Sequence, residues 1–346
     1  MHQKTSVLVT GGAGFIGSHL VDRLVNNDYN VRVLDNLSTG KLSNIQEHVE
    51  NGRVDFVEGD IKDFEQVKKC VHGVDAVMHL AAVTSVPFSV KNPALTYETN
   101  VVGTLNLLVS LAKEKVGKFV FISSCAVYGE PQYLPVDEDH PTNPISPYAE
   151  SKLLGERYCF GFHENKLLKA VALRFFNVYG LRQGLNDYSG VITRFIDRIK
   201  QGSSLIVYGD GSQTRDFVHV SNIVEAIQGS LEKESAEGQV FNIGSGKPTS
   251  IDELANTILS LAGSNLGVVH EAPRLGDIKH SYADASKASK LLDYKPTKVL
   301  RDGLREILAN SNMPSKMLGT NRLKLNFPRC VGINRIADYR VFTCAF

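Results

Sequence analysis

Three residues near the middle of the chain have side chains suited to removing a proton from an alcohol. Tyr148 and Lys152 lie four positions apart in Tyr148-Ala-Glu-Ser-Lys152, so on a helix both point to one face. An ammonium beside a phenol favours the phenolate, which lowers a pKa of about 10 and makes the phenol a usable base. Ser124, upstream, adds a hydroxyl. This spacing alone also arises by chance, so the prediction that these three residues are catalytic depends on the rest of the chain.

A glycine-rich turn near the N-terminus indicates a dinucleotide-binding loop. The apolar run Ser6–Thr10 predicts a buried strand, Gly11-Gly-Ala-Gly14-Phe-Ile-Gly17 follows at once, and the next apolar residues repeat at helical spacing. Glycines let the backbone approach a pyrophosphate, which rests on the helix N-terminus. The turn therefore supplies a place for a cofactor that takes the hydride while a base takes the proton.

An acidic residue after the second predicted strand selects the cofactor. The strand Val31–Leu34 ends in Asp35, about 20 residues after the glycines. A carboxylate at that point accepts from the ribose 2′-hydroxyl and repels a 2′-phosphate. The sequence therefore predicts NAD rather than NADP.

Composition excludes several classes of function. The chain has 346 residues, of which 42% are hydrophobic, and a net charge of +1, so it favours neither nucleic acid nor an anionic membrane as partner. No apolar run is long enough to span a bilayer, and the N-terminus passes directly into a strand, which leaves no room for a signal peptide. We expect a cytoplasmic protein with reduced thiols and no metal site, because the cysteines are odd in number and lack ligand spacing. They are Cys70, Cys125, Cys159, Cys330 and Cys344.

Apolar strands alternate with amphipathic helices through the first half of the chain. This alternation predicts a parallel, doubly wound α/β sheet, with ligands at the carboxyl ends of the strands. The polar and glycine residues noted so far follow predicted strands, as do others of interest: Gly11, Asp35, Asp60, Ala81, Ser124 and Asn177. Further strands are predicted at 54–57, 76–80, 119–123 and 170–175, and helices at 102–113 and 147–159.

The pattern loosens past Gly180, where Gly, Ser and Asp increase. We therefore predict an NAD-binding domain over 1–180, with 215–245 packing back on it, and a smaller mixed α/β substrate lobe over 181–312. Residues 313–346 carry six Lys or Arg and one Asp, a net charge of +5. Their apolar content argues against full disorder, and we assign this tail no function.

Many motifs in order make the chain similar to a known family. They are Val9-Thr-Gly-Gly-Ala-Gly-Phe-Ile-Gly-Ser-His19, Leu34-Asp-Asn-Leu37, Gly59-Asp-Ile61, His79-Leu-Ala-Ala82, Ser123-Ser-Cys-Ala-Val-Tyr-Gly129, Arg174-Phe-Phe-Asn-Val-Tyr-Gly180, Gln213-Thr-Arg-Asp-Phe-Val-His-Val220 and Pro273-Arg-Leu-Gly-Asp-Ile278. Over about residues 4 to 310 the chain resembles the nucleotide-sugar epimerases of the extended short-chain dehydrogenase/reductase family. The resemblance implies an NAD-dependent UDP-hexose 4-epimerase that works through a 4-keto sugar.

The resemblance also implies which residues hold the ligands. Asp35 and Asn36 would hold the adenosine ribose, Asp60 and Ile61 the adenine, and Lys152 the nicotinamide ribose. The NAD residues implied are Gly11, Gly14, Phe15, Ile16, Gly17, Asp35, Asn36, Gly40, Asp60, Ile61, Leu80, Ala81, Ala82, Asn100, Ser123, Tyr148, Lys152 and Phe176.

Arg215 and Arg274 would grip the UDP diphosphate, since guanidinium forks match phosphate oxygens. Tyr208 would pack near the uracil and Asp277 would bind the uridine ribose. The substrate residues implied are Ser85, Ser124, Tyr148, Asn177, Val191, Tyr208, Arg215, Arg274, Asp277 and Ser281. A homodimer through helices near 100–113 and 147–160 is implied as well.

The two residues after Ser124 bear on the reaction. Dehydratases of the family carry Asp-Glu directly after the catalytic hydroxyl residue, and decarboxylases carry Glu two places after it. Here the two residues are Cys125 and Ala126, and alanine cannot transfer a proton. This favours epimerisation, although a dehydratase or decarboxylase and a non-catalytic NAD-binding relative stay open as alternatives.

Ser281 bears on the sugar. Family epimerases that exclude N-acetyl sugars have a bulky residue at this position, so a serine predicts that UDP-GlcNAc and UDP-GalNAc also fit. A UDP-GlcNAc or UDP-glucuronate 4-epimerase is therefore a further alternative. His79 and His219 are interpreted as structural histidines rather than catalytic ones.

Overall fold

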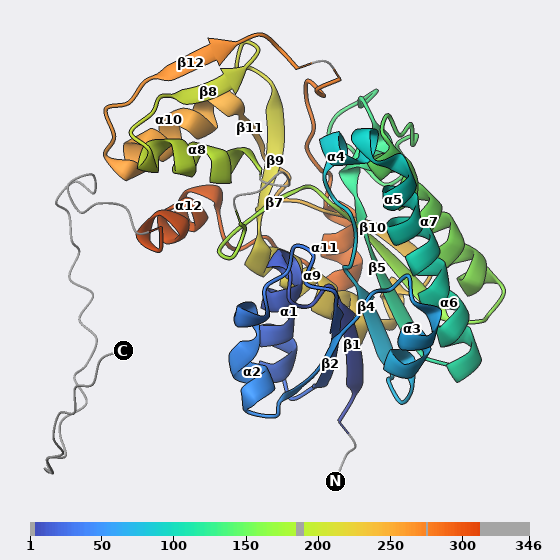
Figure 1. Cartoon of the computed structure of the whole chain (residues 1–346). Helices are drawn as coiled ribbons and strands as arrows, with labels where there is room; N and C mark the ends of the chain where they lie inside the picture. Colours follow the sequence, from blue (N-terminus) through green and yellow to red (C-terminus); the bar gives the residue numbers. More distant parts are fainter. Residues whose placement is uncertain (1–3, 185–189, 275, 312–346) are drawn as a thin grey trace, which may run out of the picture.

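A seven-stranded parallel sheet is the centre of the molecule (Figure 1). The computed structural model describes residues 4–184, 190–274 and 276–311. The sheet has the strand order β10-β6-β5-β4-β1-β2-β3, and each neighbouring pair is parallel. Its strands are β1 (Ser6–Thr10), β2 (Asn30–Asp35), β3 (Val54–Glu58), β4 (Ala76–His79), β5 (Lys118–Ser124), β6 (Lys169–Phe175) and β10 (Gln239–Ile243).

Helices cover both faces of this sheet, so the predicted doubly wound fold is confirmed. On one face α1 (Phe15–Asn26) packs with α9 (Val220–Glu232), and on the other α3 (Phe64–Val71), α6 (Gly103–Glu114) and α7 (Pro147–Glu164) lie together. Most of the strand residues that form the two apolar cores are Val, Leu, Ile or Phe. This composition is expected for parallel strands that are buried on both sides.

The strand order reverses between β1 and β4, which is where such sheets bind ligands. At their carboxyl ends, β2 and β5 finish at Asp35 and Ser124, while β1 leads into the glycine turn and β4 into Leu80. Parallel pairing brings these ends to one edge of the sheet, and the predicted NAD residues gather there for that reason.

A smaller lobe contains its own apolar core. Its helices are α8 (Val191–Lys200), α10 (Ile251–Ala262) and α12 (Leu300–Ala309), which pack with the parallel pair β8 (Leu205–Tyr208) and β12 (Val268–Glu271). A mixed three-stranded sheet of β7 (Asn177–Tyr179), β9 (Thr214–His219) and β11 (Pro248–Ser250) lies between this lobe and the main sheet (Figure 1).

The chain crosses between the two parts more than once. After β9 it returns to the main sheet as α9 and β10, and α11 (Ser286–Leu292) then packs against β10 and α9. The predicted lobe of 181–312 includes α11, although α11 packs on the main sheet. Ala288, Leu292 and Tyr294 complete the apolar core of the main sheet instead.

A π-helical turn precedes α6 and was not predicted. It is η2 (Glu98–Val102), and it carries the buried Asn100. Single π turns inside helices often occur at functional sites. The remaining short helices are α2 (Gln46–Glu50), α4 (Val86–Lys91), α5 (Pro93–Tyr97), η1 (Leu42–Asn44), η3 (Cys125–Tyr128) and η4 (Glu234–Ala236).

In the part of the chain that the structure describes, every helix is too short or too polar to cross a bilayer. The basic tail over 313–346 lies outside the described residues.

A buried ion pair joins α7 to the sheet. The Arg174 guanidinium donates from Nε and Nη2 to the two carboxylate oxygens of Glu156, at 2.9 and 2.6 Å, and both side chains are buried. Arg174 Nη1 also donates to the Tyr128 hydroxyl at 2.8 Å. Each charge is therefore matched in a region that excludes water.

Removing one member of this pair tests its importance. Arg174→Met leaves the Glu156 charge buried without its partner, which costs about 3–5 kcal/mol of unfolding free energy. The double variant Glu156→Leu/Arg174→Met removes both charges, and we expect it to lose less than the single variant. Urea unfolding of the three proteins measures both values, and equal losses for the single and double variants would contradict the expectation.

Candidate active site

The glycine turn is shaped by close backbone approach. Gly11 has φ +73°, and a Cβ there would lie 2.8 Å from the Ala81 backbone nitrogen. A Cβ on Gly17 would lie 2.1 Å from the Gly11 carbonyl oxygen. Side chains are excluded at both positions, so the loop lies close to β4. Gly14 is the N-cap of α1 and provides no side chain, and no acidic residue lies in the first turn.

The Asp35 carboxylate lies against this turn and is already hydrogen-bonded. Ala13 and Leu37 donate their backbone N–H groups to it, at 2.9 and 2.8 Å. Burial raises its pKa, while these two hydrogen bonds oppose the shift. A Cβ on Gly40 would lie 3.1 Å from both carboxylate oxygens, so Gly40 also adjoins the predicted ribose site.

The predicted adenosine residues also meet. Asn36 donates to the Asp60 carboxylate at 3.0 Å, and Asp60 accepts from the Lys62 backbone N–H at 2.8 Å. Ile61 is buried, and a Cβ on Gly103 would lie 2.6 Å from its side chain. The ends of β2 and β3 and the start of α6 therefore form one wall.

The loop after β4 is held by Asn100. Its side chain accepts from the Val83 N–H at 2.7 Å and donates to the Val83 carbonyl at 2.9 Å. A further N–H donates to Ser151 on α7, also at 2.9 Å. Leu80, Ala81 and Ala82 precede Val83, so Asn100 sets the path of this predicted NAD segment from beside it.

The predicted catalytic residues come together at the carboxyl end of β5. The Ser124 side chain is hydrogen-bonded to the Tyr148 phenol, and it also accepts from the Ala126 N–H at 3.2 Å. Lys152, only 4% exposed, donates to the Ile122 carbonyl at 2.8 Å. A half-buried serine and tyrosine and a buried lysine, from β5 and α7, thus lie at one edge of the sheet.

The expected effect of the lysine on the phenol is not observed. Burial raises the pKa of Tyr148 to about 12, and the hydrogen bond from Ser124 opposes this without reversing it. Burial likewise lowers the pKa of Lys152 to about 8. In the protein by itself, burial is the main influence on the pKa of Tyr148, and the lowering expected from Lys152 is not seen.

Two predicted NAD residues are turned toward the protein. Ser123 donates to Glu156, the partner of Arg174, and is buried. Phe176 is buried in a small apolar cluster with Tyr128 and Leu153. Glu156 was not predicted as a site residue, although it lies four positions after Lys152 and therefore on the same helix face.

The predicted UDP residues form two pairs, one that includes Arg215 on β9 of the connecting sheet and one at the end of β8 in the smaller lobe. Arg215 makes an ion pair with Asp277 at 2.5 Å, and the Arg274 guanidinium lies 3.8 Å from the centroid of the Tyr208 ring. A turn in which Asp277 N–H donates to the Arg274 carbonyl connects the two pairs. Residues separated by about 60 positions are thus adjacent, as expected if they share one ligand.

The other predicted substrate residues are more scattered. Ser85 is buried and caps α4, Asn177 is exposed at the start of β7, and Val191 begins α8. Ser281 is buried, and its backbone N–H donates to the Thr214 carbonyl beside Arg215.

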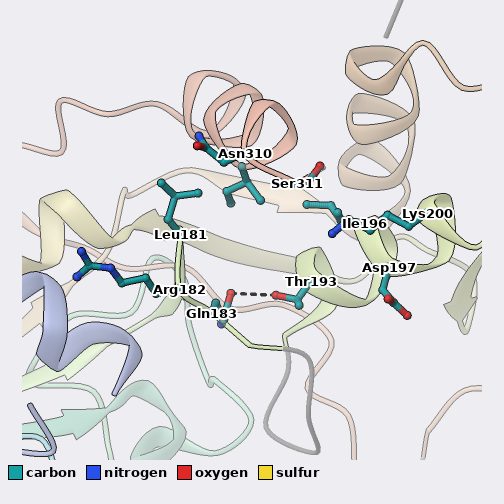
Figure 2. A pocket seen from close by; sticks show the side chains of 11 residues that line it. Leu181, Arg182, Gln183, Thr193, Ile196, Asp197, Lys200, Asn310 and Ser311 are labelled. Carbon is teal, nitrogen blue, oxygen red and sulfur yellow. Dashed lines mark hydrogen bonds between the residues drawn. The ribbon is translucent and has the colours of Figure 1, made fainter. Parts of the chain in front are cut away.

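A separate hollow of about 220 Å³ lies between α8 and the end of α12 (Figure 2). Thr193 donates to Gln183 across it at 3.2 Å. Its lining contains none of the predicted NAD or substrate residues. It is therefore distinct from the site at the ends of the strands.

Comparison with known proteins gives the family. The family model for the NAD-dependent epimerase/dehydratase family matches residues 7–244. The chain belongs to this family.

Individual relatives agree with the family assignment. A UDP-glucose 4-epimerase from Mycolicibacterium smegmatis is 37% identical over 299 residues, which cover 86% of this chain and 95% of that protein. A solved UDP-N-acetylglucosamine 4-epimerase from Methanobrevibacter ruminantium, in complex with UDP-N-acetylmuramic acid, has a TM-score of 0.84 and 38% identity, covering 89% of this chain and 98% of that one. A UDP-glucuronic acid 4-epimerase from Bacillus cereus, with UDP-glucuronic acid and NAD, has a TM-score of 0.83 and 35% identity, covering 88% and 98%.

The residues of this family member fit NAD, its cofactor. The side-chain-free turn at Gly11 and Gly17 and the uncapped N-terminus of α1 suit a pyrophosphate. Asp35 stands where a ribose hydroxyl is expected, and it keeps acceptor capacity beyond its two backbone hydrogen bonds.

The two residues that follow Ser124 offer no second acid or base near neutral pH. Burial raises the pKa of the Cys125 thiol to about 12, so the thiol stays protonated near neutral pH. Ala126 has no group that can transfer a proton.

His79 is a buried histidine, as interpreted from the sequence. Its two ring nitrogens are hydrogen-bonded to Thr10 and Thr104.

Lys152 gives the stability of this protein a pH dependence. Its pKa of about 8 in the folded chain lies below the ordinary 10.5, so between these values the unfolded chain binds more protons and stability rises with pH. Lys152→Met removes this contribution. We therefore expect the difference in unfolding free energy, wild type minus variant, to increase by about 2–3 kcal/mol between pH 7.5 and pH 10. One pKa unit corresponds to about 1.4 kcal/mol.

Urea unfolding of NAD-free wild type and Lys152→Met at a series of pH values measures this gain. A difference between the two proteins that stays constant with pH would show that Lys152 titrates normally.

Proposed function

We propose that this protein is an NAD-dependent UDP-hexose 4-epimerase that interconverts UDP-glucose and UDP-galactose through a 4-keto sugar. The observation that carries the proposal is the arrangement of Ser124, Tyr148 and Lys152 at the end of β5, where a hydrogen bond from Ser124 favours the ionised phenol and Lys152 donates to the Ile122 carbonyl. This trio supplies a base for a sugar hydroxyl at the edge of the sheet where the predicted NAD residues gather.

Each member of the trio has a role in moving one proton. Tyr148, as the phenolate, takes the proton of the sugar O4 and later returns it. Ser124 favours that phenolate by hydrogen-bonding to it, and the Lys152 ammonium favours it through its charge. Bound NAD would supply the acceptor and donor of the C4 hydride, and return of the hydride to the opposite face of the sugar would invert C4.

The smaller lobe would anchor the nucleotide while the keto sugar turns over. Arg215 and Arg274 are proposed to bind the diphosphate, Tyr208 the uracil and Asp277 the uridine ribose. Their proximity in two connected pairs supports this assignment, because a diphosphate and its nucleoside span neighbouring subsites. Ser85, Asn177 and Val191 are proposed to contact the sugar side.

Elimination or decarboxylation is disfavoured by the residues after Ser124. A second proton transfer needs a group whose pKa is close to the working pH. The Cys125 thiol, with a pKa of about 12, and the Ala126 methyl do not meet this need. The reaction that remains is return of the hydride.

Loss of the phenol tests the role of Tyr148. In Tyr148→Phe we expect kcat to fall by at least about 100-fold, because general acid–base catalysis of this kind contributes that much. The assay follows UDP-glucose and measures UDP-galactose, UDP-xylose and a 4-keto-6-deoxy product in parallel. Wild type that forms either of the last two, or a Tyr148→Phe variant with unchanged kcat, would overturn the proposal.

The sugar preference is proposed to depend on Ser281. Relatives are named for glucose, N-acetylglucosamine and glucuronate, so the family leaves this choice open. Ser281 is small and buried beside the strand that carries Arg215, and we propose that it leaves room for an N-acetyl group. A UDP-GlcNAc or UDP-glucuronate preference is the second candidate.

Enlarging this residue tests the preference. Ser281→Tyr should abolish turnover of UDP-GlcNAc and spare UDP-galactose, while Ser281→Ala should keep both activities. Rates with the two substrates are compared for each variant. Equal loss of both activities in Ser281→Tyr, with Ser281→Ala active, would show that the residue does not select the sugar.

A cytoplasmic location and a homodimer through helices near 100–113 and 147–160 stay predictions. So does the division into an NAD-binding domain and a substrate lobe as functional units.

A further inference from the structure

A continuous chain of buried hydrogen bonds connects the end of β1 with the start of α7. Thr10 Oγ1 lies 2.7 Å from His79 Nδ1, and His79 Nε2 lies 2.8 Å from Thr104 Oγ1. Thr104 donates to the backbone carbonyl of Asn100 at 2.6 Å, so this series of hydrogen bonds reaches the π-helical turn η2. All four side chains are at most 2% exposed, which removes water as an alternative partner.

The chain continues from η2 to the catalytic helix. The side-chain amide of Asn100 donates to the Ser151 hydroxyl at 2.9 Å. Ser151 in turn donates to the backbone carbonyl of Tyr148 at 2.7 Å. The same amide holds Val83 through two hydrogen bonds, at the end of the predicted NAD segment. One set of hydrogen bonds therefore joins β1, the loop after β4 and the first turn of α7.

The proton positions in this chain follow from its hydroxyls. The single Thr104 hydroxyl proton goes to the Asn100 carbonyl, so His79 Nε2 must donate to Thr104. Thr10 Oγ1 accepts from the Ala81 N–H at 3.3 Å, and its own proton is free to go to His79 Nδ1. The ring is thus neutral, with its proton on Nε2.

We infer that His79, as the neutral Nε2–H tautomer, is a positioning residue that fixes the Ala81–Val83 segment and the Tyr148 turn of α7 relative to each other. An apolar side chain of the same size would leave Thr10 and Thr104 without their histidine partners in a dry core. The ring also packs between Phe119 and Phe121, with centroid distances of 5.7 and 5.8 Å. Burial, and secondly the charge of Lys152, lower the pKa of His79 to about 3, so the tautomer persists across the working range.

The tautomer is measured directly by NMR of the histidine ring nitrogens in the full chain. We expect Nε2 to be protonated and Nδ1 bare, with no change in either signal between pH 5 and pH 9. A proton on Nδ1, or a ring that titrates in this range, would overturn the inference. This measurement uses unmodified protein, so it does not depend on whether a variant folds.

Variants test the positioning role. His79→Leu removes both hydrogen bonds, whereas His79→Gln keeps one donor and one acceptor. We expect His79→Leu to lower kcat by about 100-fold with KM nearly unchanged, because small displacements of reacting groups cost about that much. It should also weaken NAD binding at least tenfold, and His79→Gln should recover most of both losses.

Matched variants separate positioning from stability. Thr104→Val breaks the same chain one step later and should add little to His79→Leu, while Thr104→Ser keeps the hydroxyl and should behave as wild type. Leu107→Ala damages the same buried core without removing a hydrogen-bonding group. If Leu107→Ala, at equal loss of stability, lowers kcat and NAD affinity as much as His79→Leu, or if His79→Leu lowers neither, the positioning role is refuted.

The kcat measurements on these variants rest on the proposed epimerase activity. The tautomer and NAD affinity do not, so a wild-type protein inactive on UDP-sugars would leave the inference standing or falling on those two measurements.

Discussion

The attachment of α7 to the end of β5 is the constraint on which the site depends. Lys152 donates to the Ile122 carbonyl, and one turn later Glu156 accepts from Ser123 while paired with Arg174. These contacts are buried, where an unpaired polar group costs much more than at the surface. They fix the distance between the helix that carries Tyr148 and the strand that carries Ser124.

The same burial sets the charge state of the site. Removal of water raises the pKa of Tyr148 and lowers that of Lys152, so both groups are biased toward their neutral forms. Ser124 is the neighbour that favours the phenolate. At neutral pH the Tyr148 phenol therefore keeps its proton in the protein by itself, and the proposed role as a base requires that this proton be lost first.

The two kinds of predicted site residue lie in different parts of the molecule. The close backbone approach at Gly11 and the Tyr148–Lys152 pair belong to the main sheet and its helix α7. Arg215, paired with Asp277, lies on β9 of the connecting sheet, and Arg274 lies over the Tyr208 ring at the end of β8. The connecting sheet therefore lies between the residues predicted for NAD and those predicted for UDP.

Local pattern in the sequence was enough for the strands, the glycine turn, the Tyr148–Lys152 face and the family, because each is encoded within a few neighbouring residues. It did not predict that Lys152 donates to Ile122, that Glu156 pairs with Arg174, that α11 packs on β10, or that a π turn at Asn100 joins His79 to Ser151. These depend on which distant residues meet in three dimensions. The pKa of Tyr148 is the clearest case, since the lysine four positions away is visible in the sequence, whereas the burial that raises this pKa exists only after the chain has folded.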